Sequence, residues 1–300
     1  MPKSKRLVFF GNERLVSGLK HTDTPLLKGL IEHGYDVAAV VVNNADTVSR
    51  TARVLEVAEV AKAHGIPVMM PKRPSDVLEQ LIDLRADFAV LSAYGRIIPQ
   101  RVIDVFSPIG IINIHPSLLP RHRGSTPIET TITSSDQVAG VSIMQLTAGM
   151  DEGPIYGQAS YNLTGNETKF DLYERLSTMG SDFLFDLLPS ILDGSLQPKP
   201  QLLDGVTYTT TIQKNDGVID TVIDTAEVIS RNIRAHLGFP KSRLTYKNAD
   251  VIITSAKVVD SPVDGQFCVP CADNTTLLIE NVIAPSGKSM SGDAYLRGLR

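Results

Sequence analysis

Apolar residues in the first half of the chain follow two patterns that alternate along it. Short, nearly continuous apolar runs are typical of buried strands, and five of them stand at 6–10, 36–42, 67–70, 87–91 and 110–114. Apolar residues that recur every three or four positions predict amphipathic helices, and this spacing occurs at 26–33, 54–64 and 75–82, with a short segment from 100. The alternation predicts βαβ units, and hence an α/β fold with a mainly parallel sheet and helices on both faces.

Two of these helices carry local signals for their first turn. Thr24 followed by Pro25 predicts an N-cap and a first helical residue, and Ser75 predicts the cap of a later helix. In that later helix, helical spacing predicts four inward side chains, those of Val77, Leu78, Leu81 and Ile82.

The pattern changes near residue 193. Before it, 140–146 and 154–163 are strand-like, and 168–188 carries the apolar stripe of a helix that packs over the sheet. Residues 193–207 are rich in glycine and proline and show no periodicity, which predicts an interdomain linker.

One helix at 225–237 and several short β-like runs follow the linker, and this combination predicts a small barrel. The runs stand at 243–246, 251–258, 266–269 and 275–283. The predicted organisation is therefore a first domain at 1–192, a linker at 193–207 and a C-terminal domain at 208–300.

Composition narrows the class of protein. A chain of 300 residues with 42% hydrophobic residues is long enough for one large or two ordinary domains. It contains no run of about 18 apolar residues and no signal-peptide pattern, and its two cysteines argue against a disulfide framework. We therefore expect a cytoplasmic protein that does not bind membranes. The net charge of −4, with ten basic and ten acidic residues from Tyr208 onward, gives no global basic field for nucleic acid.

Two kinds of cofactor site have weak support. The turn Gly11-Asn12-Glu13 lacks the glycine fingerprint of dinucleotide-binding loops. Cys268-Val-Pro-Cys271 is half of a zinc pattern without its other half, so we expect no metal site.

The most informative stretch is 111–127, which passes from a buried strand into a loop bounded by prolines. Asn113 and His115 are two residues apart on the strand, so their side chains point to the same side of the sheet. Ligands of open α/β sheets bind beyond the carboxyl ends of the strands. A histidine before a proline is by itself more often an ordinary strand-end residue. A functional role for His115 therefore depends on the whole run of residues around it.

The run resembles the signature of the folate-dependent formyltransferases. It reads Asn113-Ile-His-Pro-Ser-Leu-Leu-Pro, followed by Arg123-Gly and Pro127-Ile, with Asp151 downstream inside Gly149-Met-Asp-Glu-Gly153. In that family an Asn-x-His pair and a downstream aspartate surround the formyl group of 10-formyltetrahydrofolate.

The resemblance covers the whole chain and implies a Rossmann-like formyl-transfer domain, a linker and a small OB-like barrel. It implies that Asn113, His115 and Asp151 are catalytic. It also implies folate contacts by six residues, Ser117, Leu118, Leu119, Pro120, Arg96 and Ile97. The implied partners are 10-formyltetrahydrofolate as co-substrate and initiator methionyl-tRNA as formyl acceptor, and the expected state is a monomer.

The residues suit acyl transfer to an amine. Asn113 and His115 are placed to donate to the oxygen that becomes negative, and one such donor is typically worth about 2.7–4 kcal/mol. Asp151 is expected to orient His115 and to help move the proton that leaves the new C–N bond.

A basic triplet, Arg121-His-Arg123, follows the site. It predicts either a solvated loop face or recognition of an anionic substrate group, because the guanidinium group matches phosphate geometry. An RNA end, a nucleotide sugar and the folate glutamate tail fit it equally.

Three other functions remain open. An N-formyltransferase acting on an amino sugar attached to a nucleotide shares the catalytic domain, and the weak basic loops favour it. Glycinamide ribonucleotide formyltransferases are usually single-domain, which the C-terminal part disfavours. A non-catalytic folate- or RNA-binding module would tolerate Asp151→Asn. The departures from the family lie on the RNA side: residues 43–52 offer only Arg50, with Arg53 close by, and the chain has no tryptophan.

Overall fold

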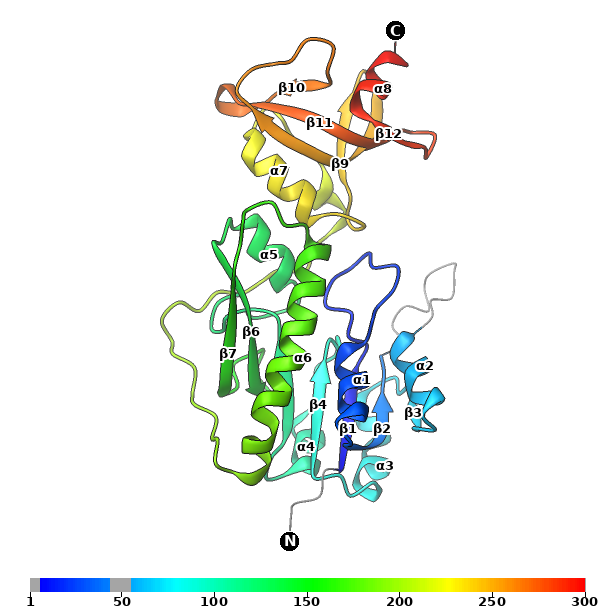
Figure 1. Cartoon of the computed structure of the whole chain (residues 1–300), viewed down its shortest axis with the longest axis vertical. Coiled ribbons are helices and arrows are strands. Elements are labelled where there is room, and N and C mark those ends of the chain that lie inside the picture. The colour runs from blue at the N-terminus through cyan, green and yellow to red at the C-terminus, as the bar shows by residue number, and fades with distance from the viewer. Residues whose placement is uncertain (1–5, 44–54, 300) are drawn as a thin grey trace.

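The computed structural model describes residues 6–43 and 55–299, so Arg50 and Arg53 lie outside the described residues. The described chain forms two parts, a large part built on a seven-stranded sheet and a smaller part above it in Figure 1. The strands of the large sheet are β1 (Arg6–Gly11), β2 (Asp36–Val41), β3 (Val68–Met69), β4 (Phe88–Ser92), β5 (Ile111–His115), β6 (Val138–Gln145) and β7 (Ile155–Asn162).

The sheet order is β3-β2-β1-β4-β5-β6-β7. The first five strands are parallel, whereas β6 and β7 are antiparallel to their neighbours. The helices of this part are α1 (Pro25–Glu32), α2 (Glu56–Ala63), α3 (Leu78–Asp83), α4 (Gln100–Ile103), α5 (Pro127–Thr133) and α6 (Lys169–Asp193), with short 3-10 turns η2 (Pro74–Val77) and η3 (Asp104–Phe106). The predicted α/β class is confirmed.

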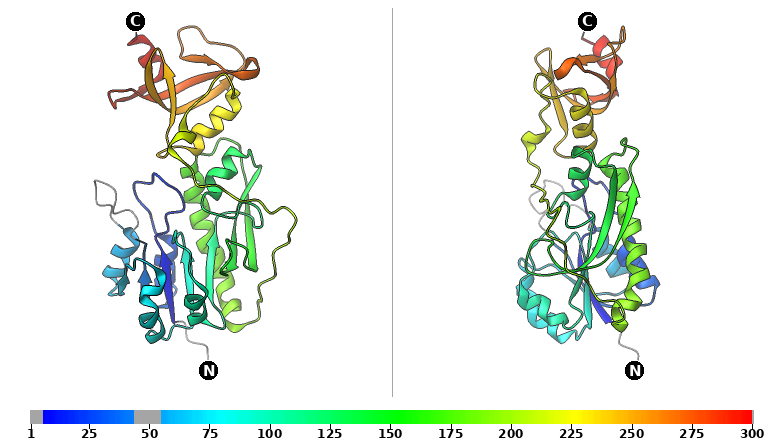
Figure 2. Two further views of the ribbon diagram at one scale, coloured as in Figure 1. Left: turned by 180° about the vertical axis from the view of Figure 1, so that it is seen from behind. Right: turned by 90° about the vertical axis from the view of Figure 1, so that its left-hand side faces the viewer.

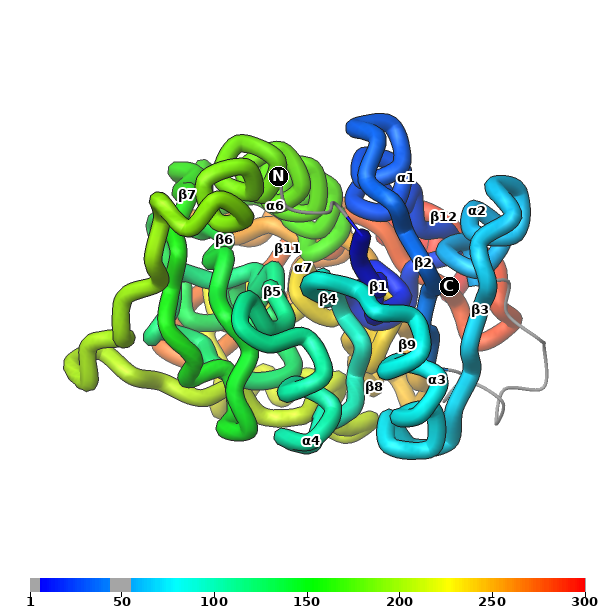
Figure 3. The backbone as a smooth tube through the Cα atoms, turned by 90° about the horizontal axis from the view of Figure 1, so that it is seen from below, coloured from blue at the N-terminus to red at the C-terminus, as the bar shows by residue number. Residues whose placement is uncertain are grey.

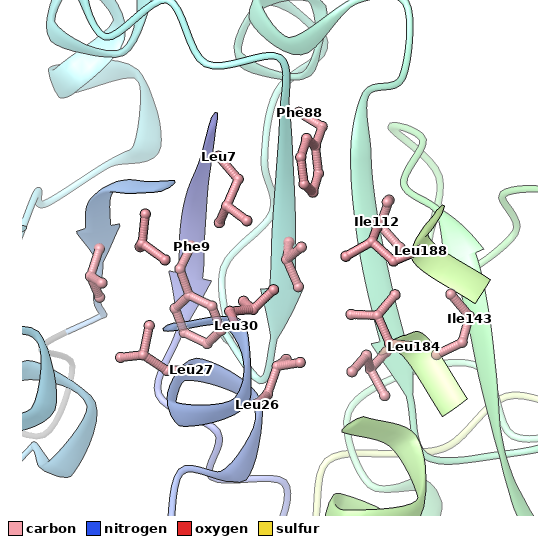
Figure 4. Close-up of a cluster of buried hydrophobic side chains, with 14 of the residues drawn as sticks. Leu7, Phe9, Leu26, Leu27, Leu30, Phe88, Ile112, Ile143, Leu184 and Leu188 are labelled. Atoms are coloured by element: carbon pink, nitrogen blue, oxygen red, sulfur yellow. The ribbon is translucent and has the colours of Figure 1, made fainter. Parts of the chain in front are cut away.

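The helices cover both faces of the sheet because successive strand residues point to opposite sides. Figure 3 shows α1 and α6 on one side and α3 and α4 on the other. Leu7 and Phe9 pack with α1 and α6 on the first side, as Figure 4 shows, whereas Val8 and Phe10 pack with α3 and α4 on the second.

The smaller part begins with η4 (Lys214–Gly217) and α7 (Ala226–Ala235). Five antiparallel strands follow and curl over α7 (Figure 2): β8 (Ser242–Tyr246), β9 (Ala249–Val259), β10 (Cys268–Pro270), β11 (Thr276–Ile283) and β12 (Ser289–Ser291). The part also contains η5 (Ala272–Asn274) and ends with α8 (Gly292–Arg297). Four of these strands and α7 match the predicted elements, whereas β12 and α8 were not predicted.

Two of the local helix predictions were confirmed only in part: Pro25 begins α1 as predicted, but the capping of that helix and the start of α3 differ. Thr24 occupies the cap position of α1, but its side chain makes no capping hydrogen bond. The carboxylate of Glu13 instead accepts from the backbone N–H groups of Leu26 and Leu27, at 2.9 Å each. A residue eleven positions upstream therefore caps α1, which local signals cannot show.

The helix predicted from Ser75 was also partly wrong. Ser75 lies inside the 3-10 turn η2, and α3 begins only at Leu78. Leu81 is fully buried as predicted, but Ile82 is 48% exposed. The 3-10 turn changes the rotation per residue, so the inward stripe shifts away from Ile82.

A buried lysine of the large part, paired with a glutamate there, also bonds to the smaller part. Lys169 at the start of α6 is fully buried, and its Nζ lies 3.6 Å from Oε1 of Glu129 on α5. The same Nζ donates to the carbonyl oxygen of Phe239, beyond α7, at 2.8 Å. Burial lowers the pKa of Lys169 and raises the pKa of Glu129. Because the ammonium group contacts both parts, it holds the smaller part against the large one.

Candidate active site at the carboxyl end of the sheet

A cavity of about 530 Å³ opens beyond the carboxyl ends of β1, β4 and β5. From β1 the chain builds the sheet in one direction, through β2 and β3, and from β4 it builds in the opposite direction, through β5. The cavity therefore lies next to the boundary between β1 and β4, where the strand order reverses. This is the usual ligand position in open α/β sheets, and the volume is in the range of small-molecule sites.

Asn113 and His115 project from β5 into this cavity. Ile112 and Ile114 alternate with them and pack into the opposite face of the sheet. Pairing of β5 with β4 and β6 on both sides fixes the direction of all four side chains. Within the residues that the structure describes, no hydrogen bond to the Asn113 amide is found, so its N–H and C=O groups remain available to a ligand.

The ring of His115 is held by a hydrogen bond at Nε2. Its Nε2 lies 2.9 Å from the carbonyl oxygen of His122 in a buried hydrogen bond. A carbonyl only accepts, so Nε2 carries the proton and donates. The other nitrogen, Nδ1, faces Asp151, whose Oδ2 is 3.7 Å away.

Asp151 lies in the loop between β6 and β7. Its φ is 49°, a left-handed conformation that is uncommon for residues other than glycine. Its Oδ2 accepts from the backbone N–H of Gly124 at 2.8 Å, and its side chain is 19% exposed. The structure thus brings the three residues predicted as catalytic together at one cavity, with the Asp151 carboxylate facing Nδ1 of His115.

The six predicted folate-binding residues fall into two groups. Arg96 and Ile97 line the cavity, and Ile97 is 80% exposed at its rim. The side chains of Ser117, Leu118, Leu119 and Pro120 are not among those lining the cavity.

Side chains of β6 and β7 hold the backbone of the 117–120 loop. The hydroxyl of Ser142 donates to the Ser117 carbonyl at 2.7 Å and accepts from the Leu119 N–H at 3.0 Å. The Gln158 amide donates to the Leu119 carbonyl at 2.8 Å. These hydrogen bonds fix the position of the loop between Pro116 and Pro120, directly after the strand that carries Asn113 and His115.

None of the three residues of the basic triplet lines the cavity, and only Arg121 is exposed, whereas His122 and Arg123 are buried. The guanidinium group of Arg121 binds the carboxylate of Asp136, as does Nε2 of His122 at 2.8 Å. Burial is the main cause that lowers the pKa of His122. Arg123 is only 5% exposed and donates twice to Oε1 of Gln201. The triplet therefore stabilises the loop that contacts His115.

The sequence did not reveal the part that the 193–207 segment plays at the site. The Gln201 amide donates to the carbonyl oxygens of Asp151 and Gly153, at 2.7 and 2.8 Å. Thr207 and Thr209 are hydrogen bonded to residues 122–126. Glycine and proline in the segment indicated a linker, and no local pattern indicates which distant loop such a segment contacts.

A second cavity, of about 600 Å³, lies between α7, β9 and the turns before β6 and α6. Its lining contains none of Asn113, His115 and Asp151, the three residues predicted as catalytic. Across residues 6–43 and 55–299, no group of three or more His, Cys, Asp or Glu side chains is arranged to hold a metal ion. The same residues include no helix with the length and apolarity needed to cross a membrane.

The sequence matches two family descriptions, "Formyl transferase" over residues 12–188 and "Formyl transferase, C-terminal domain" over residues 211–300. It is 34% identical over 297 residues to a methionyl-tRNA formyltransferase of Lactobacillus acidophilus, covering 94% of this chain and 93% of that protein.

Two solved structures share the fold. One is an N-formyltransferase from Helicobacter canadensis in complex with folinic acid and dTDP-3-aminofucose, with a TM-score of 0.67, 18% identity, and coverage of 92% of this chain and 98% of that one. The other is HypX from Aquifex aeolicus in complex with tetrahydrofolic acid, with a TM-score of 0.66, 15% identity, and coverage of 97% of this chain and 46% of that one.

Proposed function

The chain belongs to the formyl transferase family, and from this premise we propose that it moves the formyl group of 10-formyltetrahydrofolate to the amino group of methionyl-tRNA. One observation carries the chemistry: Asn113, His115 and Asp151 meet at a single cavity beyond the parallel strands. The acceptor follows from the L. acidophilus relative, which matches this chain over both of its parts.

In this reaction the amine nitrogen bonds to the formyl carbon, and the bond from that carbon to N10 of the folate breaks. An α-amino group has a pKa of roughly 8, so about a tenth of it is already neutral near pH 7. The larger demands are the negative charge on the formyl oxygen and the proton that must leave the attacking nitrogen.

The Asn113 amide is suited to donate a hydrogen bond to the formyl oxygen, because it lines the cavity and no described residue binds it. A donor of this kind is typically worth about 2.7–4 kcal/mol of transition-state stabilisation. Nδ1 of His115 and Oδ2 of Asp151 are placed to take up the proton that leaves the attacking nitrogen and to deliver it to N10 of the departing folate, directly or through a water molecule.

The cavity also fits a reduced folate. Its volume of about 530 Å³ and its mixed lining suit a flat, partly apolar molecule with polar edges. Ile97 and Met150 are 80% and 58% exposed and supply apolar surface at the rim, while Arg96 supplies a cation. These residues would hold the folate, with the formyl group toward Asn113.

A second candidate acceptor is an amino sugar attached to a nucleotide. The balance of ten basic and ten acidic residues from Tyr208 onward favours it, because a neutral second part offers no field for RNA. The 34% identity to a methionyl-tRNA enzyme outweighs this, since the structure with a bound sugar nucleotide is only 18% identical.

The test is a competition in which 10-formyltetrahydrofolate with a labelled formyl group is offered to the enzyme together with Met-tRNA and a panel of amino-sugar nucleotides. We expect label on the methionyl amine. Label on a sugar would replace the proposed acceptor and leave the catalytic residues unchanged. Absence of label on every acceptor would contradict the proposed reaction.

A further inference from the structure

The segment that connects α6 to α7 does more than join the two parts. It leaves α6 at the lower left of Figure 1 and passes along the edge of β7. There Lys199 and Ile155 exchange two backbone hydrogen bonds of 2.8 Å. The segment is thus fixed against β7 of the large part before it reaches the active site.

Farther along, the segment is bonded to the loop that follows His115. Arg123 N–H donates to the Thr207 carbonyl at 2.9 Å, and Thr209 N–H donates to the Arg123 carbonyl at 2.7 Å. The Thr209 hydroxyl accepts from the Thr126 N–H at 3.1 Å. Between these two docked stretches, Leu202 and Leu203 are 75% and 88% exposed, so only part of the segment is held.

Gln201 lies where the segment meets both halves of the site. Its Nε2 donates to the carbonyl oxygens of Asp151 and Gly153, and its Oε1 accepts two hydrogen bonds from the guanidinium group of Arg123. Both N–H groups and both lone pairs of the amide are therefore used. One side chain joins the loop that contains Asp151 to the loop that contains Gly124.

Asp151 needs such a restraint. Its left-handed φ of 49° is costly for a residue with a side chain, and surrounding contacts must maintain it. Its neighbours Gly149 and Met150 are half-buried and exposed, so the loop is not fixed by burial. The two Gln201 bonds hold the backbone, and the Gly124 N–H holds the carboxylate.

We propose that Gln201 is a positioning residue that holds Asp151 facing His115, so that the segment between the two parts completes the active site. This inference rests on the proposed function, since it assumes that Asp151 takes part in formyl transfer. Gln201 does not line the cavity, so it acts through Asp151 and not on the substrate.

The experiment compares Gln201→Leu and Gln201→Glu with the parent enzyme. Leucine removes every bond. Glutamate keeps an acceptor for Arg123 but presents oxygen to the carbonyls of Asp151 and Gly153. Both variants are expected to lower kcat roughly tenfold to a hundredfold, because misplacement of a catalytic group by about 1 Å has effects of this size. The KM for the formyl-folate should stay within about twofold, because the cavity lining is intact.

The control is Gln197→Leu, because Gln197 is exposed and its amide bonds only to the Gly194 carbonyl beside it. It should match the parent. Folate binding, followed by fluorescence, and the unfolding temperature report whether each variant is folded. A folded Gln201→Leu enzyme with the parent's kcat would overturn the proposal.

A double-mutant cycle separates positioning from general damage. If Gln201 acts only through Asp151, adding Gln201→Leu to Asp151→Asn should cause no further loss, whereas unrelated effects would add. Full additivity would overturn the inference. If Asp151→Asn alone had the parent's activity, the proposed role of Asp151 would fail and this inference with it. If Asp151→Asn were impaired while Gln201→Leu was not, only the inference would fail.

Discussion

Two loops that border the cavity each present an acidic residue in left-handed backbone, Glu13 after β1 with φ 53° and Asp151 between β6 and β7 with φ 49°. Both carboxylates accept backbone N–H groups. Glu13 is 1% exposed, and both of its carboxylate oxygens accept hydrogen bonds from the first turn of α1. The side chain of Asp151 is 19% exposed and faces His115 across the cavity.

The comparison shows that a perturbed pKa does not by itself mark a catalytic acid. Burial is the main cause that raises the pKa of Glu13 to about 7, although the two N–H groups and Lys28 oppose it. A carboxyl group that titrates near neutrality is a common sign of a functional site. Glu13 has the raised pKa but does not line the cavity, whereas Asp151 lines it.

The largest expected effect tests the role of the Asp151 carboxylate. Asp151→Asn keeps an oxygen for the Gly124 N–H but removes the charge and the proton acceptor. We expect kcat to fall by at least about 100-fold, equivalent to about 3 kcal/mol, with folate binding nearly unchanged. Steady-state kinetics and folate titration measure the two quantities. Glu152→Gln, an exposed neighbour in the same loop, is the matched control and should behave like the parent.

The next effect concerns stability and comes from Glu13. Its pKa in the folded protein, about 7, lies above the ordinary value of 4.5, so folding favours the protonated form. The stability it contributes is fully present below pH 4.5 and is lost as the pH rises through 7. Between pH 5 and pH 8, the free energy of unfolding of the parent should fall relative to Glu13→Gln by about 2 to 3 kcal/mol.

Denaturant unfolding of both proteins at several pH values measures this difference, and other titrating groups cancel in the subtraction. A difference that does not change with pH would mean that Glu13 does not hold its proton in the folded state. The kcat of Glu13→Gln should remain near that of the parent at pH 8, which separates the two carboxylates by function.

The smallest effect distinguishes the two ways in which helices are capped. The Thr168 hydroxyl accepts from the Asp171 N–H at the start of α6, so Thr168→Val should lower the free energy of unfolding by about 1 kcal/mol. The Thr24 hydroxyl has no partner among the described residues, and Glu13 caps α1 instead. Thr24→Val should therefore change stability by less than about 0.5 kcal/mol. Equal losses in the two variants would contradict capping by Glu13.

Contacts between residues close in the sequence could be predicted from the sequence, whereas contacts between distant residues could not. The period of a strand predicted that Asn113 and His115 share a face, and the family signature that contains them indicated their catalytic role. The partners of α1, Asp151 and Arg123 could not be predicted, because Glu13, Gln201 and Thr207 contact them across loops that carry no periodic pattern.

The sequence by itself determined the α/β order of the elements, the buried faces and the residues at the end of β5, since these depend on the spacing of apolar residues along a few turns or strand steps. It also carried the family signature. Only the tertiary structure decided that the segment between the two parts restrains Asp151, that Arg123 is buried and that Glu13 caps a helix. Each of these depends on hydrogen bonds between residues 13 to 85 positions apart, and buried polar groups take whichever partner the fold brings within reach.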